Sequence, residues 1–315
     1  MSTLICGSVA YDTIMVYPGE FKDQILPDKV HILNVSFLVP EMRREFGGTA
    51  GNIAYNLKML GGDPIIMATI GEDCDPYLEH LQRLDITARC VRRIESTFTG
   101  QAFVTTDQAD NQITAFHPGA MSHSHENAVG DAGAAVKRGI VSPDGRDGML
   151  AHSRQFKAAG IPFMFDPGQA MPLFNGDELL ALVDMADQVA VNDYEAELLI
   201  GKTGLTIEQL AERAGVLVVT LGPKGSRIYA DGERHEIPCA KPTAIVDPTG
   251  GGDAYRAGLL YGMSNGMDWP TTGRLSALLG AIKIAHRGAQ NHRIDLTELR
   301  SQFETEFGVP LTLTA

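Results

Sequence analysis

A chain of 315 residues, 44% of them hydrophobic and 21% charged, has the composition of an ordinary globular protein and is long enough for one large core with a minor lobe. No apolar run approaches the length that crosses a bilayer, which argues against a membrane protein. The formal net charge of −13, without a basic cluster to offset it, argues against a nucleic-acid polymer as partner. The first residues lack the features of a signal peptide, so we expect a cytoplasmic protein.

The predicted elements alternate between strand and helix. Residues 4–6 and 64–70 are continuous apolar runs typical of buried strands, and the apolar positions between 53 and 60 have helical spacing. Further strands are predicted at 140–142, 161–165, 189–191 and 216–220, with helices around 147–159, 177–185 and 207–213. Such alternation predicts a parallel sheet covered on both faces, with ligands bound beyond the carboxyl ends of its strands.

Two regions interrupt this alternation and predict a small antiparallel lobe. Residues 31–39 are strand-like, and residues 102–107 face 112–116 across a polar turn as a β-hairpin. We expect the inserted segments, about 13–46 and 98–118, to form a lid that excludes water from the ligand face, with an ordinary surface hairpin as the alternative. An exposed lid edge would either pair with a second copy, giving a homodimer, or be blunted and leave a monomer.

The run Asp247-Pro-Thr-Gly-Gly-Gly-Asp253 is the most informative motif. Its consecutive glycines, Gly250, Gly251 and Gly252, leave backbone N–H groups free to point at an anion, and apolar residues at helical spacing follow. A helix N-terminus there favours a phosphate, and Asp253 on the same turn could accept a proton from a hydroxyl. Taken alone, a glycine-rich turn with Asp253 as an ordinary helix cap is an equal alternative.

Other polar stretches lie at the predicted ligand end of the sheet. Gly47-Gly48-Thr-Ala-Gly-Asn52 bends into a helix, and Asp12 follows the first strand, where it could grip vicinal hydroxyls. Asn192 and Glu195 follow another strand and could hold a hydrated Mg²⁺ through water. Thr220-Leu-Gly-Pro-Lys-Gly225 ends a further strand and can wrap the phosphates or sugar of a nucleotide. Each stretch has a turn or a helix cap as its simpler alternative.

Together these motifs, in this order and spacing, resemble the ribokinase-like (PfkB-type) carbohydrate kinases over nearly the whole chain. The resemblance implies a single kinase domain over residues 1–315, with a central mostly parallel sheet flanked by helices and a small β-lid. It implies transfer of the γ-phosphoryl group of ATP, with Mg²⁺, to a primary hydroxyl, usually of a sugar or nucleoside. In this family a K⁺ ion often lies beside the glycine-rich loop, held partly by backbone near positions matching Asp247 and Thr249. The resemblance leaves open whether K⁺ is used here.

The resemblance also implies roles by position. Asp253 would be the catalytic base, and the amides of Gly250, Gly251 and Gly252 the anion hole, although the family most often has alanine where this chain has Gly251. Three further groups complete the implied site: Asp12, Gly48 and Asn52 on the ribose hydroxyls, Asn192 and Glu195 on the phosphates and Mg²⁺, and Thr220, Gly222 and Gly225 on ATP.

A narrower resemblance concerns the acceptor. Asp110-Asn-Gln-Ile-Thr114, Phe165-Asp-Pro-Gly-Gln169 and Tyr255-Arg-Ala-Gly258 are similar to archaeal nucleoside kinases and bacterial adenosine kinases, rather than to typical ribokinases or fructokinases. We therefore expect an ATP-dependent nucleoside kinase, with adenosine favoured, that forms the 5′-monophosphate in purine salvage. The alternatives are a ribokinase-like sugar kinase acting on ribose or fructose, and a nucleoside sensor that binds without catalysis.

Side chains that would contact the nucleobase are expected in and after the lid. The amides of Gln112 and Gln169 could read a purine edge, and Phe116 or Met121 could stack on the base, although each residue has an ordinary structural role as its alternative. Arg256 either braces its helix or reaches the phosphates.

Overall fold

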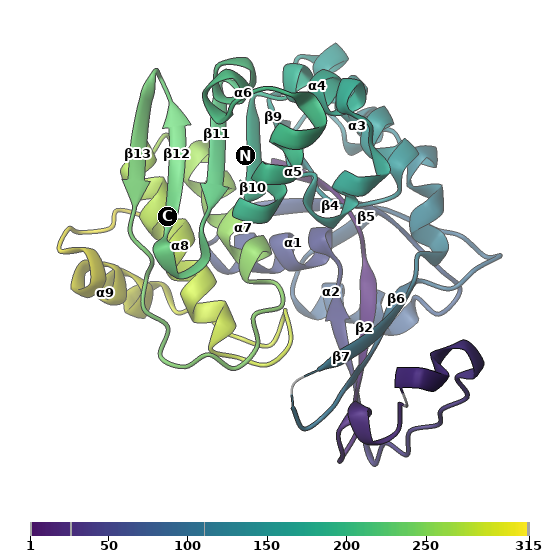
Figure 1. Cartoon of the computed structure of the whole chain (residues 1–315). Coiled ribbons are helices and arrows are strands. Elements are labelled where there is room, and N and C mark those ends of the chain that lie inside the picture. The colour runs from purple at the N-terminus through teal and green to yellow at the C-terminus, as the bar shows by residue number, and fades with distance from the viewer. Residues whose placement is uncertain (1, 26, 110, 314–315) are drawn as a thin grey trace.

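The body of the protein is built on one large sheet, seen in the computed structural model, which describes residues 2–25, 27–109 and 111–313 (Figure 1). The strands of this sheet are β1 (Ser2–Cys6), β4 (Asp63–Ile70), β5 (Thr87–Arg93), β8 (Val136–Val141), β9 (Phe163–Phe165), β10 (Gln188–Asn192), β11 (Val216–Thr220), β12 (Ser226–Ala230) and β13 (Glu233–Ile237). They lie in the order β13-β12-β11-β10-β9-β8-β1-β4-β5. All neighbouring pairs are parallel except those of β12, which runs antiparallel to β11 and β13. The predicted mostly parallel sheet is confirmed.

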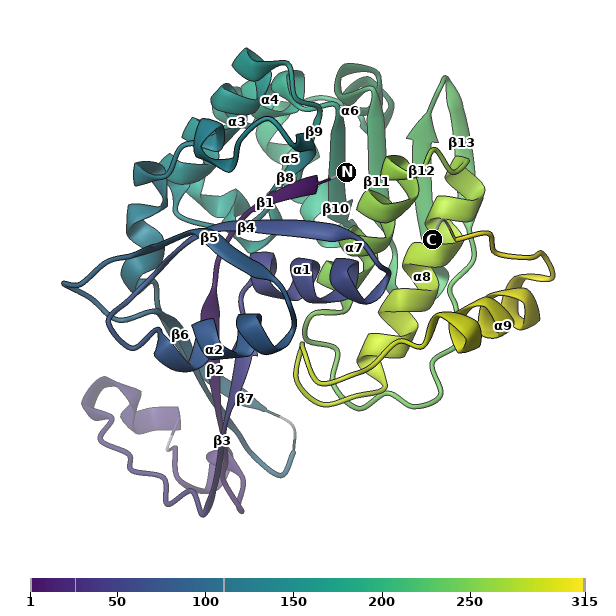
Figure 2. The same ribbon diagram turned by 180° about the vertical axis from the view of Figure 1, so that it is seen from behind.

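Helices cover both faces of this sheet, as predicted (Figures 1 and 2). In β1, Leu4 and Cys6 point into one apolar cluster and Ile5 into the other, because successive side chains of a strand face opposite sides. One face is covered by α1 (Thr49–Met59), α2 (Asp75–Arg83), α7 (Gly251–Ser264), α8 (Trp269–Ile284) and α9 (Leu296–Phe307). The other is covered by α3 (Arg146–Ala159), α4 (Gly176–Met185), α5 (Asp193–Thr203) and α6 (Ile207–Ala214). Short 3₁₀ segments lie between these elements at Gly119–Glu126, Val129–Ala132, Gly168–Leu173 and Gly222–Lys224.

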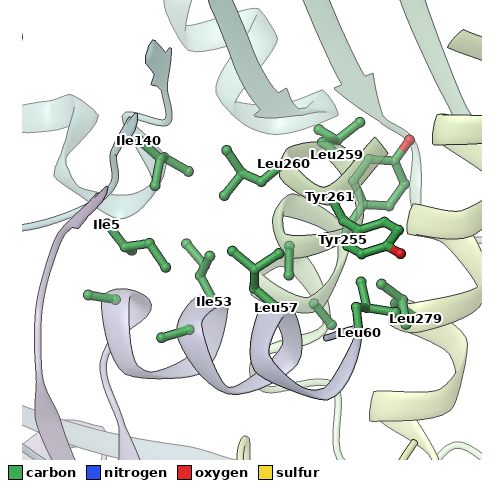
Figure 3. Close-up of a cluster of buried hydrophobic side chains, with 14 of the residues drawn as sticks. Ile5, Ile53, Leu57, Leu60, Ile140, Tyr255, Leu259, Leu260, Tyr261 and Leu279 are labelled. Carbon is green, nitrogen blue, oxygen red and sulfur yellow. The ribbon is translucent and has the colours of Figure 1, made fainter. Parts of the chain in front are cut away.

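The packing of α1 against α7 positions the ligand end of the sheet. Ile53 and Leu57 of α1 meet Leu260 of α7 in a buried cluster, with none of the three more than 2% exposed (Figure 3). Burying one such side chain contributes about 1.5–3 kcal/mol to stability. The contact therefore holds the N-termini of α1 and α7 in one arrangement above the sheet.

The lid is a separate sheet that projects from the body (Figure 1). Its strands are β2 (Ala10–Val16), β3 (Glu41–Gly47), β6 (Gly100–Thr106) and β7 (Gln112–His117), in the order β3-β2-β6-β7. The predicted β6–β7 hairpin is confirmed. The expectation of a wholly antiparallel lid is wrong, because β2 and β6 are parallel. Both strands run outward from the body, β2 directly after β1 and β6 after β5, so they share one direction.

The strand expected at 31–39 is also wrong. The strand of this region is β3, whereas Pro27–Ile32 is a 3₁₀ segment, Phe21–Asp23 is another, and residues 33–39 form neither helix nor strand. Of the apolar side chains that suggested a strand, Leu33 and Leu38 are exposed, at 51% and 85%, whereas Val35, Phe37 and Val39 are half-buried. Apolar character was thus a misleading guide in a segment that contributes little to the core. Asp110, in the predicted hairpin turn, lies outside the described residues.

Within the described part of the chain, no helix combines the length and the apolar character needed to span a membrane.

The close contact of α7 with α8 gives a test of the core. A Cβ at Gly258 would lie 2.6 Å from Ser276 Cα, so Gly258→Ala should force the helices apart and lower the free energy of unfolding by about 1–3 kcal/mol. Urea denaturation measures this change. The matched control is Gly201→Ala in α5, where nothing lies within 4 Å of the added methyl group, and it should be neutral or stabilise by up to about 1 kcal/mol. Equal losses in both variants would contradict the packing argument.

Candidate active site

A cleft of about 880 Å³ lies where the carboxyl ends of β1 and β8–β11 meet the N-termini of α1 and α7. Side chains from the lid close another side of it. The predicted site residues that line the cleft are Asp12, Gly48, Asn52, Phe116, Met121, Gln169, Asn192, Glu195, Thr220, Gly222, Gly250, Gly252 and Asp253. Residues that are far apart in the sequence thus converge on one space, as the position of ligand sites in parallel sheets predicts.

Three predicted site residues do not line the cleft. Gly251 donates its N–H to the carbonyl of Pro248 at 3.1 Å. Gly225 is buried with φ +88, and a Cβ there would overlap the carbonyl oxygen of Ile237, so glycine is needed for the turn between β11 and β12. Gln112 lies exposed at the start of β7.

The glycine-rich loop forms an anion nest, which we define as the N–H groups of Gly250 and Gly252 at the start of α7. Gly250 caps the helix with φ +78, and a Cβ there would come within 2.9 Å of Ala289 Cβ. Among the described residues, neither nest N–H has a hydrogen-bond acceptor. Unpaired donors and the positive end of the α7 dipole therefore face the cleft and favour an anion there.

Asp253 lies on the same helical turn and accepts a hydrogen bond from Asn52 Nδ2 at 2.8 Å. Desolvation raises the pKa of Asp253 to about 7, with Asp166 acting in the same direction, while the hydrogen bond from Asn52 opposes the shift. A carboxyl group that titrates near neutral pH can exchange a proton with a bound hydroxyl, which is the requirement for a general base. The functional interpretation of the motif therefore has geometric support.

A buried network that the sequence did not reveal orients Asn52. Gln290 Nε2 donates to Asn52 Oδ1 at 3.0 Å, so the amide nitrogen of Asn52 is directed at Asp253. Gln290 Nε2 also lies 3.0 Å from the Tyr77 hydroxyl, which donates to the Gly47 carbonyl at 2.7 Å. Gln290 stands in no recognisable motif, and only its position in the fold identifies it.

The Gly47–Gly48 turn brings α1 close to the lid strand β2. Gly48 has φ +85, and a Cβ there would lie 2.5 Å from the carbonyl oxygen of Ser8. Glycine is therefore needed at position 48, whereas a Cβ at Gly47 would lie 2.5 Å from Asp12 Oδ2 and would displace that carboxylate. Desolvation raises the pKa of Asp12 to about 6, with the negative charges of Asp247 and Glu45 adding to the shift.

Arg256 braces its helix against the sheet. Its Nε and Nη2 donate to the two carboxylate oxygens of Asp166 at 3.0 and 3.2 Å, and both side chains are buried. Asp166 follows β9 directly, so the pair ties α7 to the carboxyl end of the sheet beneath Asp253. Asp166 belongs to a motif that the sequence singled out, but without a role for this residue.

Asn192 and Glu195 form a capping box at the start of α5. Glu195 N donates to Asn192 Oδ1 at 2.7 Å, and Asn192 N donates to Glu195 Oε2 at 2.8 Å. The simpler alternative, a helix cap, is therefore realised. Desolvation raises the pKa of Glu195, and the negative charge of the nearby Asp166 raises it further.

The described residues contain no group of three His, Cys, Asp or Glu that could hold a metal. A Mg²⁺ ion here would take most of its ligands from water and phosphate, as Mg²⁺ commonly does.

Asp144 is a cleft residue that the sequence analysis missed. It follows β8 and is 3% exposed, with Oδ1 accepting from Gly145 N at 2.8 Å. Burial raises the pKa of Asp144 to about 8, so the neutral acid dominates at neutral pH. Like Asp12, Asp144 lies a few residues after a predicted strand, here residues 140–142, and this position is the sequence signal that could have identified it.

Comparison with known proteins places this geometry among kinases. The family model described as pfkB family carbohydrate kinase matches residues 8–295. A nucleoside kinase from Burkholderia thailandensis, solved with inosine, is 48% identical with a TM-score of 0.89, covering 98% of this chain and 99% of that one. Another structure of that protein contains ADP and inosine. A nucleoside kinase from Methanocaldococcus jannaschii is 31% identical over 82% of this chain and 85% of its own length. A ribokinase from Lactococcus lactis is 25% identical over 82% and 85% of the two chains.

The raised pKa of Asp253 has a consequence for stability. The folded protein binds this proton more tightly than the unfolded chain, so the contribution of Asp253 to stability falls as the pH rises from 3.8 to about 7. Asparagine carries no such proton. Asp253→Asn should therefore gain stability relative to the wild type as the pH rises through this range. Urea unfolding at about pH 5 and about pH 8 measures the difference; a difference that is constant with pH would contradict the shift.

Proposed function

The chain belongs to the pfkB family of carbohydrate kinases, enzymes that transfer a phosphoryl group to an alcohol, and we propose that it is an ATP-dependent nucleoside kinase with adenosine as the favoured acceptor. The observation that carries the proposal is the convergence of the Asp253 carboxyl group and the anion nest on one cleft. The similarity to two nucleoside kinases supports a nucleoside acceptor, and one of them binds inosine together with ADP.

The proposed reaction gives ADP and the nucleoside 5′-monophosphate. Asp253 takes the proton of the ribose 5′-hydroxyl as that oxygen attacks the γ-phosphate in line. The N–H groups of Gly250 and Gly252 and the α7 dipole stabilise the charge that develops on the phosphoryl oxygens. Mg²⁺, held through water by Glu195 and directly by the phosphates, would neutralise further charge. In this proposal, alignment of the reacting groups and electrostatic stabilisation of the developing charge thus account for most of the rate enhancement.

The ribose is held, in this proposal, by residues of the lid strand β2 and of the start of α1. The Asp12 carboxylate can accept hydrogen bonds from two vicinal hydroxyls, and Gly48 and Asn52 line the same cleft. Because Asn52 also bonds to Asp253, a hydroxyl held by Asn52 lies near the base. Binding of the sugar and alignment of the reacting oxygen are therefore coupled.

The nucleobase is proposed to lie against Phe116 and Met121, within reach of Gln169. Asp144 adds a proton donor at this wall, since the residue after it, Gly145, packs against the carbonyl of Met121. Gln112 does not line the cleft, so its proposed contact with the base has no structural support.

The residues proposed to bind ATP that line the cleft are Asn192, Thr220 and Gly222. Gly225 does not line the cleft, and its role is to allow the buried turn that follows Thr220 and Gly222.

An acceptor panel tests the proposed substrate class. ADP release measured with adenosine, inosine, cytidine, ribose and fructose should show turnover with nucleosides, adenosine among the best, and none with free sugars. Turnover with ribose or fructose alone would establish the sugar kinase instead. Tight binding of adenosine without ADP release would establish a sensor.

Asp253→Asn tests the proposed base. Substrate binding should persist while kcat falls by a factor on the order of 10² to 10⁴, the usual loss for a general base. In the wild type, kcat/KM should rise with pH through about 7, because the base must lose its proton, and the variant should lack this rise. The control is Asp177→Asn, an exposed aspartate in the first turn of α4 that does not line the cleft. Near-normal turnover of Asp253→Asn would refute the assigned role.

Two further expectations remain predictions. A homodimer formed through the lid is supported by large apolar side chains that the lid exposes, Met42, Phe103 and Ile113. Residence in the cytoplasm rests on the sequence alone.

A further inference from the structure

A buried lysine lies directly behind the anion nest. Lys283, in the last turn of α8, is 0% exposed, and its Nζ donates to the carbonyl oxygens of Asp247 at 2.7 Å and His286 at 3.1 Å. Its ammonium group forms no salt bridge with a described carboxylate, unlike most lysines that proteins bury. The partners of this cation are thus backbone carbonyl groups.

These carbonyl groups belong to the two segments that shape the nest. Asp247 N donates to the carbonyl of Ile284 at 3.1 Å, and Asp247 Oδ2 accepts from Gly288 N at 2.9 Å. The same carboxylate accepts from Thr249 N at 3.0 Å, just before Gly250. The loop that leads into α7 is therefore fastened to the segment after α8, and the lysine ammonium lies at the junction.

A cluster of carbonyl oxygens around a positive charge is also how proteins hold a bare alkali cation. The family resemblance would put a K⁺ ion beside this loop, with backbone near Asp247 and Thr249 among its ligands. In this chain the Asp247 carbonyl oxygen is already the acceptor of Lys283 Nζ at 2.7 Å. An added cation would compete for the same oxygen and lie against the ammonium charge, so these residues do not fit K⁺.

We propose that Lys283 supplies, as a tethered ammonium ion, the positive charge that a monovalent cation would otherwise bring to this loop, so that the protein works without K⁺. The inference rests on the proposed kinase activity for its kinetic tests only. Lys283 is a positioning residue, which holds the Asp247 and His286 carbonyl groups together and thereby the nest that Gly250 begins.

The electrostatics agree with this arrangement. Burial lowers the pKa of Lys283, and the negative charges of Asp247, Asp253 and Glu45 oppose that shift. The net pKa of Lys283 is lowered, and these carboxylates, which do not contact Nζ, reduce the extent of that shift. A positive charge at this point also favours the ionised form of Asp253 and an anion in the nest.

The first test uses the wild type and no variant. The kcat for phosphorylation is measured in tetramethylammonium chloride and in potassium chloride at equal ionic strength, with constant MgCl₂ and with ATP supplied as its tetramethylammonium salt. We expect equal rates. A rate that rises to saturation with K⁺ would overturn the proposal.

The second test replaces the lysine. Lys283→Met removes the charge but fills the space, and Lys283→Ala removes both; each should lower kcat by roughly 10- to 100-fold through misplacement of the nest. Ammonium or K⁺ should restore part of the rate in Lys283→Ala and none in Lys283→Met. The control is Lys137→Ala, since Lys137 also donates to a carbonyl, that of Ala134, but lies near the amino end of β8. Unchanged kcat in Lys283→Met, or equal rescue of both variants, would overturn the proposal.

Thermal unfolding provides a readout that needs no turnover. The Tm of Lys283→Ala should rise with K⁺ or ammonium but not with tetramethylammonium, because only a small cation can bind in the space left by the side chain. The Tm of the wild type should show no such difference. A wild-type Tm that rises specifically with K⁺ would refute the inference even if no acceptor were turned over. If neither variant folds, the wild-type measurements decide.

Discussion

The hydrogen bond from Asn52 to Asp253 joins the first turns of two helices that lie 201 residues apart in the chain. It exists because α1 and α7 are packed together through Ile53, Leu57 and Leu260, far from any solvent. The same packing places the Gly48 turn and the anion nest on one cleft. The hydroxyl binding proposed for α1 and the proton acceptance proposed for α7 would thus be parts of one rigid contact, and no loop would have to move to bring them together.

The cleft concentrates carboxyl groups whose pKa values are raised by desolvation, to about 6 for Asp12, about 7 for Asp253 and about 8 for Asp144. Keeping acids in such surroundings lowers stability at neutral pH, and the large core on both faces of the sheet offsets that loss. Near neutral pH each of these carboxyl groups therefore binds a proton part of the time and can act as a hydrogen-bond donor or acceptor.

Much of the body could be predicted from the sequence, because continuous apolar strands alternate with helices and because the motifs at 47–52 and 247–253 are contiguous. The lid was harder. Strand β3 is rich in charge, as Glu41-Met-Arg-Arg-Glu45 shows, and apolar residues before it are exposed. The parallel pairing of β2 with β6 depends on where each leaves the body, which no local pattern records. Gln290, Tyr77 and Lys283 are common residue types whose partners lie in other elements, so only the folded chain gives them a role.

The parallel pair at the centre of the lid has a mechanical consequence. β2 and β6 leave the body side by side at Ala10 and Gly100, and β3 and β7 return to it beside them at Gly47 and His117, so all four strands of the lid are anchored at one end of its sheet. Asp73 fastens this end to the body, accepting from Thr99 N at 2.8 Å and from Gln101 Nε2 at 3.1 Å. Asp12 and Phe116 travel with the lid, whereas Asn52 and Asp253 stay with the body. Any displacement of the lid would therefore move Asp12 and Phe116 as one unit relative to Asn52 and Asp253 and would change the width of the cleft between them.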